Sequence, residues 1–231
     1  MTLTLMRHPH IDLATQRCIG QTDVDLSFEG RSSLKSLARE ACRLSPDRVV
    51  SSDQKRCRLL AEEIAGQLRI RPVFDPLWRE IDFGFWENRT WEAIRREETE
   101  AFAKWVADFV TAAPPGGESF LQLQKRILSA IDAMLPDRTG ETAQTSSGAS
   151  TGLYSHTSFS ISPTGAPKRV PAVLVVTHAG VMRAAYAAFA NLPLSQAFDH
   201  KIPYGGMFHV RRCGNVSAIE SAYPFLTGSA A

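Results

Sequence analysis

Residues 3–10 read Leu3-Thr4-Leu5-Met6-Arg7-His8-Pro9-His10, a short apolar run that ends in an arginine and a histidine. The run predicts a β-strand, and Pro9 both favours extended geometry at His8 and prevents the strand from continuing. His8 is therefore expected at the carboxyl end of a strand with its ring turned outward, where open α/β sheets bind ligands. Arg7 adds a permanent cation suited to phosphate, and an imidazole can act as a nucleophile. Taken alone, these residues are more simply interpreted as a strand end that carries two ordinary surface polar side chains.

The remainder of the chain alternates predicted strands with predicted helices, which is typical of an α/β fold. Strands are predicted near 47–51, 71–74, 173–176, 205–211 and 215–220, and helices near 27–44, 54–68, 90–110, 118–135, 179–190 and 194–200. The predicted N-caps are Ser27 for the first helix, Ser52 or Asp53 for the second, and Ser119 for the helix near 118–135.

Length and composition limit the class of protein. The chain has 231 residues, of which 44% are hydrophobic and 22% charged, and its formal net charge is +2. No block of Lys and Arg indicates nucleic-acid binding, and no apolar run reaches the roughly 20 residues that span a bilayer. No signal peptide is visible, and the cysteines at 18, 42, 57 and 213 lack the spacing of a disulfide frame or zinc site. We therefore expect a cytoplasmic protein without nucleic-acid or membrane partners.

One segment interrupts the alternating pattern. Ser, Thr and Gly make up more than half of residues 139–167, and no apolar period persists from about 136 to 168. This composition predicts a flexible surface insertion, within which His156 is an exposed loop residue. We expect residues 1–231 to form a single domain that carries this insertion.

A second histidine follows a second buried-type strand, Val173-Leu174-Val175-Val176-Thr177, at position 178. Parallel strands end at the same edge of a sheet, so His178 and His8 are expected to share a site. Arg56 falls in the first turn of the helix predicted at 54–68, where amide N–H groups favour a bound anion. Two arginines and two imidazoles suit a phosphoryl group, whose transfer needs positive charge and an in-line nucleophile.

An acidic and aromatic loop follows the strand predicted at 71–74. Residues 77–88 place large apolar side chains around the carboxylates of Glu80, Asp82 and Glu87. A carboxyl held in a partly dry environment is a better proton donor. A structured loop whose carboxylates pair with the two neighbouring arginines explains the composition equally well. The aromatic stripe from 91 to 109 is most simply interpreted as core.

Five motifs occur in a recognisable order: Arg7-His8, Ser51-Ser52-x-x-x-Arg56, Arg79-Glu80-Ile81-Asp82-Phe83-Gly84-x-Trp86-Glu87, Gly116-Gly117-Glu118-Ser119 and Thr177-His178-Ala179-Gly180-Val181-x-Arg183. Together they resemble the histidine phosphatase superfamily, also called phosphoglycerate mutase-like, over about residues 3–190. The resemblance implies an α/β fold with a mostly parallel mixed sheet flanked by helices on both faces. It also implies a phosphohistidine mechanism.

The resemblance assigns a role to each candidate residue. His8 matches the nucleophile, Arg7 and Arg56 the phosphate clamp, and His178 the second imidazole that stabilises the transferring group. Glu80 matches the general acid that protonates the leaving oxygen and then acts as the base for water. No metal or other cofactor is implied, because the arginines and His178 supply the positive field.

The loops are most similar to the α-ribazole phosphatase branch of the superfamily. This similarity makes Arg17, Gln21 and Thr22 candidate substrate-loop residues. The implied partner is a small phosphorylated metabolite, with α-ribazole 5′-phosphate or a related compound as the candidate substrate of a phosphatase.

Two departures from the superfamily pattern leave alternatives open. Pro9 replaces the usual glycine, although its carbonyl can still accept a hydrogen bond that orients the His8 ring. The usual asparagine a few residues later has no equivalent, and Asp12 nearby would repel phosphate. The alternatives to a phosphatase are phosphoglycerate mutase-type phosphoryl transfer and a non-catalytic phosphate-binding regulatory module.

Overall fold

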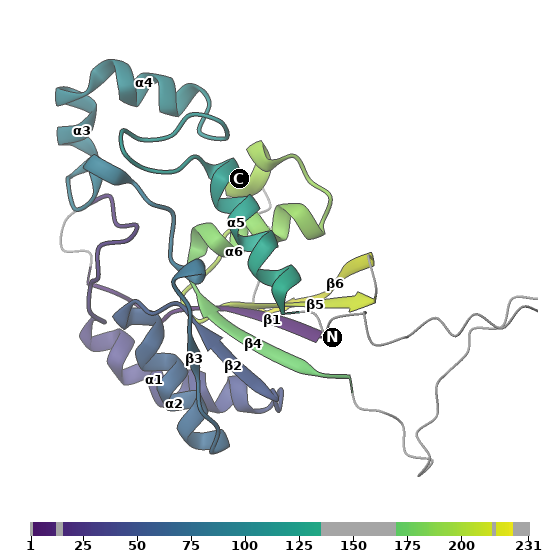
Figure 1. Cartoon of the computed structure of the whole chain (residues 1–231). Helices are drawn as coiled ribbons and strands as arrows, with labels where there is room; N and C mark the ends of the chain where they lie inside the picture. Colours follow the sequence, from purple (N-terminus) through teal and green to yellow (C-terminus); the bar gives the residue numbers. More distant parts are fainter. Residues whose placement is uncertain (1, 13–15, 135–169, 214–215, 224–231) are drawn as a thin grey trace, which may run out of the picture.

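A computed structural model describes residues 2–12, 16–134, 170–213 and 216–223 (Figure 1). Its strands are β1 (Thr2–Arg7), β2 (Arg48–Ser51), β3 (Val73–Phe74), β4 (Ala172–Thr177), β5 (Met207–Cys213) and β6 (Val216–Tyr223). Its α-helices are α1 (Phe28–Cys42), α2 (Lys55–Leu68), α3 (Trp91–Glu97), α4 (Thr99–Ala107), α5 (Phe120–Ala133) and α6 (Ala179–Phe189). Short 3₁₀-helices are η1 (Pro76–Trp78), η2 (Gly84–Trp86) and η4 (Leu194–Asp199). The insertion predicted at 136–168, with His156, lies outside the described residues.

The described strands form one sheet in the order β3-β2-β4-β1-β5-β6. β3, β2, β4 and β1 run parallel, whereas β5 is antiparallel to β1 and β6 is antiparallel to β5. The expected mostly parallel mixed sheet is therefore confirmed. The parallel strands require crossover connections, and the helices between them supply these.

The register of the two central strands determines where the histidines emerge. β1 and β4 pair so that Arg7 lies opposite Thr177, the last residue of each strand. Immediately beyond this pair, the backbone N–H of His8 donates to the carbonyl of Thr177 at 2.9 Å. His8 and His178 consequently leave the sheet at the same edge, as the sequence predicts.

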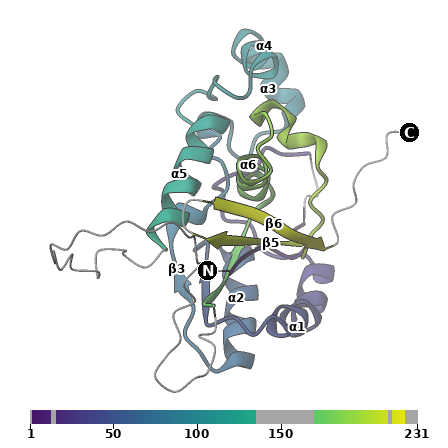
Figure 2. The ribbon, with the colours of Figure 1, turned by 90° about the vertical axis from the view of Figure 1, so that its right-hand side faces the viewer.

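Helices cover both faces of the sheet, with α1 and α2 on one side and α5 and α6 on the other (Figures 1 and 2). Alternation along β1 directs Leu3 and Leu5 into the α5–α6 cluster and Met6 into the α1–α2 cluster. A third and smaller cluster contains Cys18, Trp86 and Ile94 and packs against the aromatic side chains of α3 and α4. These two helices lie away from the sheet (Figure 1).

The single helix predicted over 90–110 is wrong, because the structure divides it into α3 and α4 at Glu98. Glu98 has φ −128° and ψ 47°, outside helical geometry. Its carboxylate accepts a hydrogen bond from the indole N–H of Trp86 at 2.8 Å and forms an ion pair with Arg89. These side-chain contacts hold Glu98 in its non-helical conformation. They could not be predicted from the helical periodicity of the sequence.

The predicted caps are partly confirmed. Ser27 accepts from the N–H of Gly30 at 3.0 Å, and Ser119 forms a reciprocal capping box at the start of α5. The cap predicted for α2 is wrong, because Gln54 occupies the N-cap position without a side-chain capping bond. Asp53 instead forms an ion pair with Arg79.

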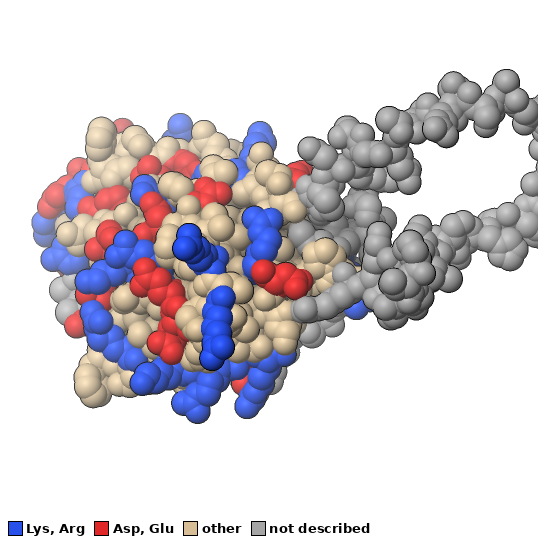
Figure 3. All heavy atoms as spheres, turned by 60° about the horizontal axis from the view of Figure 1, so that its bottom comes forward, with Lys and Arg blue, Asp and Glu red and all other residues tan. Residues whose placement is uncertain are grey.

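Charges of both signs are interspersed on the side of the molecule where α1 and α2 lie (Figure 3). Ion pairs on this surface include Arg31 with Asp25 and Arg58 with Glu62. Within the described part of the chain, every helix is too short or too polar to cross a bilayer. The described cysteines Cys18, Cys42 and Cys57 are free thiols.

Candidate active site

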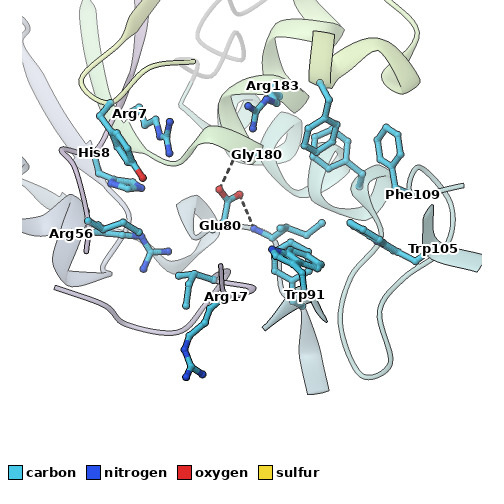
Figure 4. Close-up of a pocket in the computed structure, with 17 residues that line it drawn as sticks. Arg7, His8, Arg17, Arg56, Glu80, Trp91, Trp105, Phe109, Gly180 and Arg183 are labelled. Carbon is cyan, nitrogen blue, oxygen red and sulfur yellow. Dashed lines mark hydrogen bonds between the residues drawn. The ribbon is translucent and has the colours of Figure 1, made fainter. Parts of the chain in front are cut away.

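A cavity of about 250 Å³ opens beside the carboxyl ends of β1 and β4. It brings together five of the predicted site residues, namely Arg7, His8, Arg17, Arg56 and Glu80. Figure 4 shows Arg7, His8 and Arg56 on one side, Trp105 and Phe109 on the other, and Glu80 between them. The remaining predicted residues, Gln21, Thr22 and His178, do not line the cavity, and neither does Asp12.

His8 is only 3% exposed, and it lines the cavity at the carboxyl end of β1, where the sequence predicts a ligand site. Its Nδ1 lies 2.7 Å from the carbonyl oxygen of Pro9. A carbonyl can only accept, so Nδ1 carries the proton and Nε2 keeps its lone pair. The orienting role expected of the Pro9 carbonyl is confirmed.

Burial lowers the pKa of His8 well below 6.5, and the charges of Arg56 and Arg7 lower it further. Burial and Arg56, followed by His8 and Arg7, lower the pKa of His178 in the same direction. Both imidazoles are therefore neutral at physiological pH. Neutral imidazole is the form that can attack phosphorus.

Arg56 is 1% exposed, and its guanidinium donates to four acceptors among the described residues. Its two terminal nitrogens donate to the carbonyls of Thr22 at 2.8 Å and Gly20 at 2.6 Å. Further bonds reach Gln54 Oε1 at 3.0 Å and, from Nε, His178 Nδ1 at 3.2 Å. Because these bonds compensate for its burial, Arg56 brings a fixed positive charge to the cavity wall.

His178 lies beside His8, with ring centroids 5.2 Å apart and planes at 60°. Because Nδ1 accepts from Arg56, the proton resides on Nε2. That nitrogen faces Ser52 Oγ at 3.0 Å and Cys57 Sγ at 3.3 Å. The two imidazoles meet as the sequence predicts, but His178 is fully buried and contacts Arg56 instead of the cavity.

The carboxylate of Glu80 is fixed by two backbone donors. Oε1 accepts from the N–H of Ile81 at 2.9 Å, and Oε2 accepts from Gly180 at 3.0 Å in the first turn of α6. A Cβ atom at position 180 would lie 2.2 Å from Oε1, so this approach requires glycine. The alternative ion pairs with neighbouring arginines do not form, since Arg79 pairs with Asp53 and Arg89 with Glu97 and Glu98.

Glu87, unlike Glu80, binds the backbone of the loop at residues 20–22. Its carboxylate accepts from the N–H groups of Gly20 at 3.2 Å, Gln21 at 2.7 Å and Thr22 at 3.0 Å. The carbonyls of Gly20 and Thr22 are bound by Arg56 on the other edge of the same loop. The loop is thus fixed from both edges, and Ile19 and Arg17 before it reach the cavity.

The family description for the histidine phosphatase superfamily (branch 1) matches residues 3–221. The chain belongs to this superfamily. Phosphoserine phosphatase 1 of Hydrogenobacter thermophilus is 27% identical over 195 residues, which cover 84% of this chain and 78% of that protein. A probable phosphoglycerate mutase of Escherichia fergusonii is 32% identical over 132 residues, covering 57% of this chain and 61% of the mutase.

Solved structures share the fold of this histidine phosphatase. The α-ribazole phosphatase of Shigella flexneri superposes with a TM-score of 0.72 at 18% identity, covering 96% of each chain. Bacillus stearothermophilus YhfR superposes with a TM-score of 0.73 at 24% identity, covering 95% of each chain. These similarities establish the superfamily fold.

The cavity of this histidine phosphatase also contains two polar residues that were not predicted from the sequence, Arg183 and Tyr204. The guanidinium of Arg183 lies 4.9 Å from the ring centre of Phe198, and its Nε donates to the carbonyl of His200 at 3.3 Å. Its place at the end of the fifth motif was an available signal. Tyr204 has no comparable signal, because it precedes β5 without a recognisable pattern.

The aromatic stripe predicted as core has two separate uses. Ile94 is fully buried, whereas Trp91, Trp105 and Phe109 are half-buried and line the cavity. The rings of Trp91 and Trp105 stack at 5.7 Å with 17° between their planes. Helical spacing identifies an apolar face but does not tell whether that face meets a core or a cavity.

We expect the free energy of unfolding of this histidine phosphatase to decrease as the pH falls below 6.5. Because the folded-state pKa of His8 and His178 lies well below 6.5, the unfolded chain binds protons that the folded site refuses. Each imidazole contributes up to about 1.4 kcal/mol per pH unit between its two pKa values. Denaturant titrations at pH 7.5, 6.5 and 5.5 should give a shallower pH slope for His178→Gln than for the wild type. Equal slopes would contradict the neutral burial of His178.

Proposed function

We propose that this histidine phosphatase hydrolyses a small phosphomonoester through a phosphohistidine at His8. The observation that carries the proposal is the neutral imidazole of His8 at the cavity wall. Its Nδ1 is fixed by the Pro9 carbonyl, which leaves Nε2 as the nucleophile. Arg7 and Arg56 line the same cavity and supply positive charge for the phosphoryl oxygens in the transition state.

In the first step, His8 Nε2 attacks phosphorus in line with the ester oxygen. A P–N bond forms while the P–O bond breaks, and Glu80, as the proposed general acid, transfers a proton to the leaving alcohol. In the second step, Glu80 takes a proton from a water whose oxygen attacks phosphorus. The P–N bond breaks and inorganic phosphate leaves, which restores His8. His178 supports both steps by holding the Nε side of Arg56.

The leaving group that fits the cavity best is flat and largely apolar. The rings of Trp91, Trp105 and Phe109 line the cavity on the side away from Arg7 and Arg56. These rings can form stacking and edge contacts with an aromatic group of the substrate. α-Ribazole 5′-phosphate carries such a ring, in agreement with the resemblance of the loops to the α-ribazole phosphatase branch. We therefore propose this metabolite, or a related phosphomonoester with an aromatic group, as the substrate.

Replacing Trp91 by leucine is expected to raise the KM for 1-naphthyl phosphate by about three- to tenfold, because one aromatic contact is lost. The KM for glycerol 2-phosphate should stay unchanged, since this ester does not reach the aromatic wall. Steady-state kinetics with both esters provide the measurement. Phe74→Leu, an aromatic exchange on the edge strand β3, serves as the matched control. Equal losses for both esters would contradict an aromatic leaving-group site.

The function itself is tested by a screen of phosphorylated metabolites that includes α-ribazole 5′-phosphate, phosphoserine and the phosphoglycerates. Release of inorganic phosphate to water supports the phosphatase. Transfer of the phosphoryl group between substrate hydroxyls without net phosphate release would identify a mutase. Binding of inorganic phosphate without turnover of any ester would identify a non-catalytic module.

A further inference from the structure

The segment 202–206, between η4 and β5, contacts both the backbone and the side chain of Arg7. The N–H of Arg7 donates to the carbonyl of Gly206 at 2.9 Å, and the N–H of Gly205 donates to the carbonyl of Arg7 at 3.2 Å. The terminal nitrogen Nη1 of Arg7 donates to the carbonyl of Ile202 at 2.6 Å. None of the five sequence motifs includes this segment.

The side chain of Tyr204 projects from this segment toward the carboxyl end of β1. Its ring centre lies 3.8 Å from the guanidinium carbon of Arg7, 5.6 Å from the His8 ring and 4.8 Å from the His10 ring. The next residue, Gly205, has φ +72°, a backbone conformation that residues with a side chain rarely adopt. A Cβ atom there would also lie 2.4 Å from Leu37, so the turn that places Tyr204 is closely constrained.

The two arginines of the cavity are held very differently. Arg56 donates to four acceptors, whereas the side chain of Arg7 bonds only to the carbonyl of Ile202 and to Tyr204 among the described residues, and its buried Nε has no partner there. Burial lowers the pKa of Arg7, while Tyr204 and the carboxylate of Glu80 act in the opposite direction. A guanidinium stacked on an aromatic face is attracted electrostatically, and more strongly where water is excluded. The ring of Tyr204 is therefore the main constraint on the plane of the Arg7 guanidinium.

We propose that Tyr204 is a positioning residue for the phosphate clamp. Its ring face fixes the plane of the Arg7 guanidinium, so that the donors of Arg7 not used by Ile202 are directed at the phosphoryl group. The proposal rests on the proposed function, because it takes Arg7 to contact the phosphoryl group. It assigns to the 202–206 segment a part in catalysis that depends on the aromatic ring of Tyr204, with the hydroxyl as a further partner of Arg7.

The test compares Tyr204→Leu with Tyr204→Phe. Isothermal titration calorimetry with inorganic phosphate should show about tenfold weaker binding for the leucine variant and a clearly smaller loss for the phenylalanine variant, which keeps the aromatic face but loses the hydroxyl. The kcat/KM for p-nitrophenyl phosphate should follow the same order. Tyr186→Leu removes a half-buried phenol ring that packs on His200 outside the cavity, and it should leave phosphate affinity unchanged.

A double-mutant cycle separates positioning from general stability. In an Arg7→Ala background, Tyr204→Leu should cause no further loss of phosphate affinity, because there is no guanidinium left to position. Equal losses with and without Arg7, or a phenylalanine variant as weak as the leucine variant, would overturn the proposal. A wild-type protein that binds phosphate but hydrolyses no ester would refute only the proposed function, since the titration still reports on Tyr204.

Discussion

Replacing His8 by alanine is expected to lower kcat for every phosphomonoester substrate by about 10⁴-fold or more, the loss typical of a removed nucleophile. The remaining arginines can still bind phosphate but offer no atom to form the covalent intermediate. After rapid mixing with a ³²P-labelled ester and quenching under alkaline conditions, the wild type should retain labelled protein. The His8→Ala variant should retain none.

The matched control is His209→Ala, because His209 lies on β5 and contacts Thr4 at 2.8 Å, away from the cavity lining. This variant should keep both the label and the turnover of the wild type. A labelled His8→Ala protein would show that another residue receives the phosphoryl group. Unchanged turnover would remove His8 from the mechanism altogether.

The second large effect is expected from Glu80→Gln, and its size should depend on the leaving group. An alkyl phosphate needs a proton on its leaving oxygen, so its kcat/KM should fall by about 10²- to 10⁴-fold. p-Nitrophenolate leaves without a proton, so the first step with p-nitrophenyl phosphate should remain fast. Loss of the base then slows the attack of water, and the phosphoenzyme should accumulate as a burst of about one equivalent.

Stopped-flow measurement of p-nitrophenolate release gives the burst, and steady-state assays with glycerol 2-phosphate give the alkyl comparison. Glu62→Gln, on the exposed side of α2, is the control for a lost carboxylate charge. If Glu80→Gln slows both esters equally and produces no burst, the carboxylate holds structure through Ile81 and Gly180 and does not transfer protons.

The parts of the site carried by regular strands were predictable from the sequence. Hydrophobic runs that end in histidines give β1 and β4 directly, and the parallel rule then brings His8 and His178 to one edge. The Pro9 carbonyl contact was also predictable, because a proline retains its acceptor when it loses its donor. Each of these inferences depends on backbone geometry that neighbouring residues determine.

Side-chain contacts between distant segments could not be predicted from the sequence. His178 faces Arg56 and Ser52 because of a ring orientation that no spacing encodes. Tyr204 meets Arg7 across 197 positions only because the turn at Gly205 directs it there. The break at Glu98 likewise depends on the indole of Trp86, which the tertiary structure supplies.

The small cluster formed by Cys18, Trp86 and Ile94 is packed apart from the two clusters that flank the sheet, although Phe83 touches both regions. Trp91 and Trp105 in the cavity wall consequently pack on a cluster of their own, whereas Phe109 packs on the α5–α6 cluster. Substitutions on α3 and α4 can reshape the proposed space for the alcohol without moving the strand ends that carry the proposed nucleophile. Selection can therefore redirect such an enzyme to a new ester while its reaction chemistry is inherited intact.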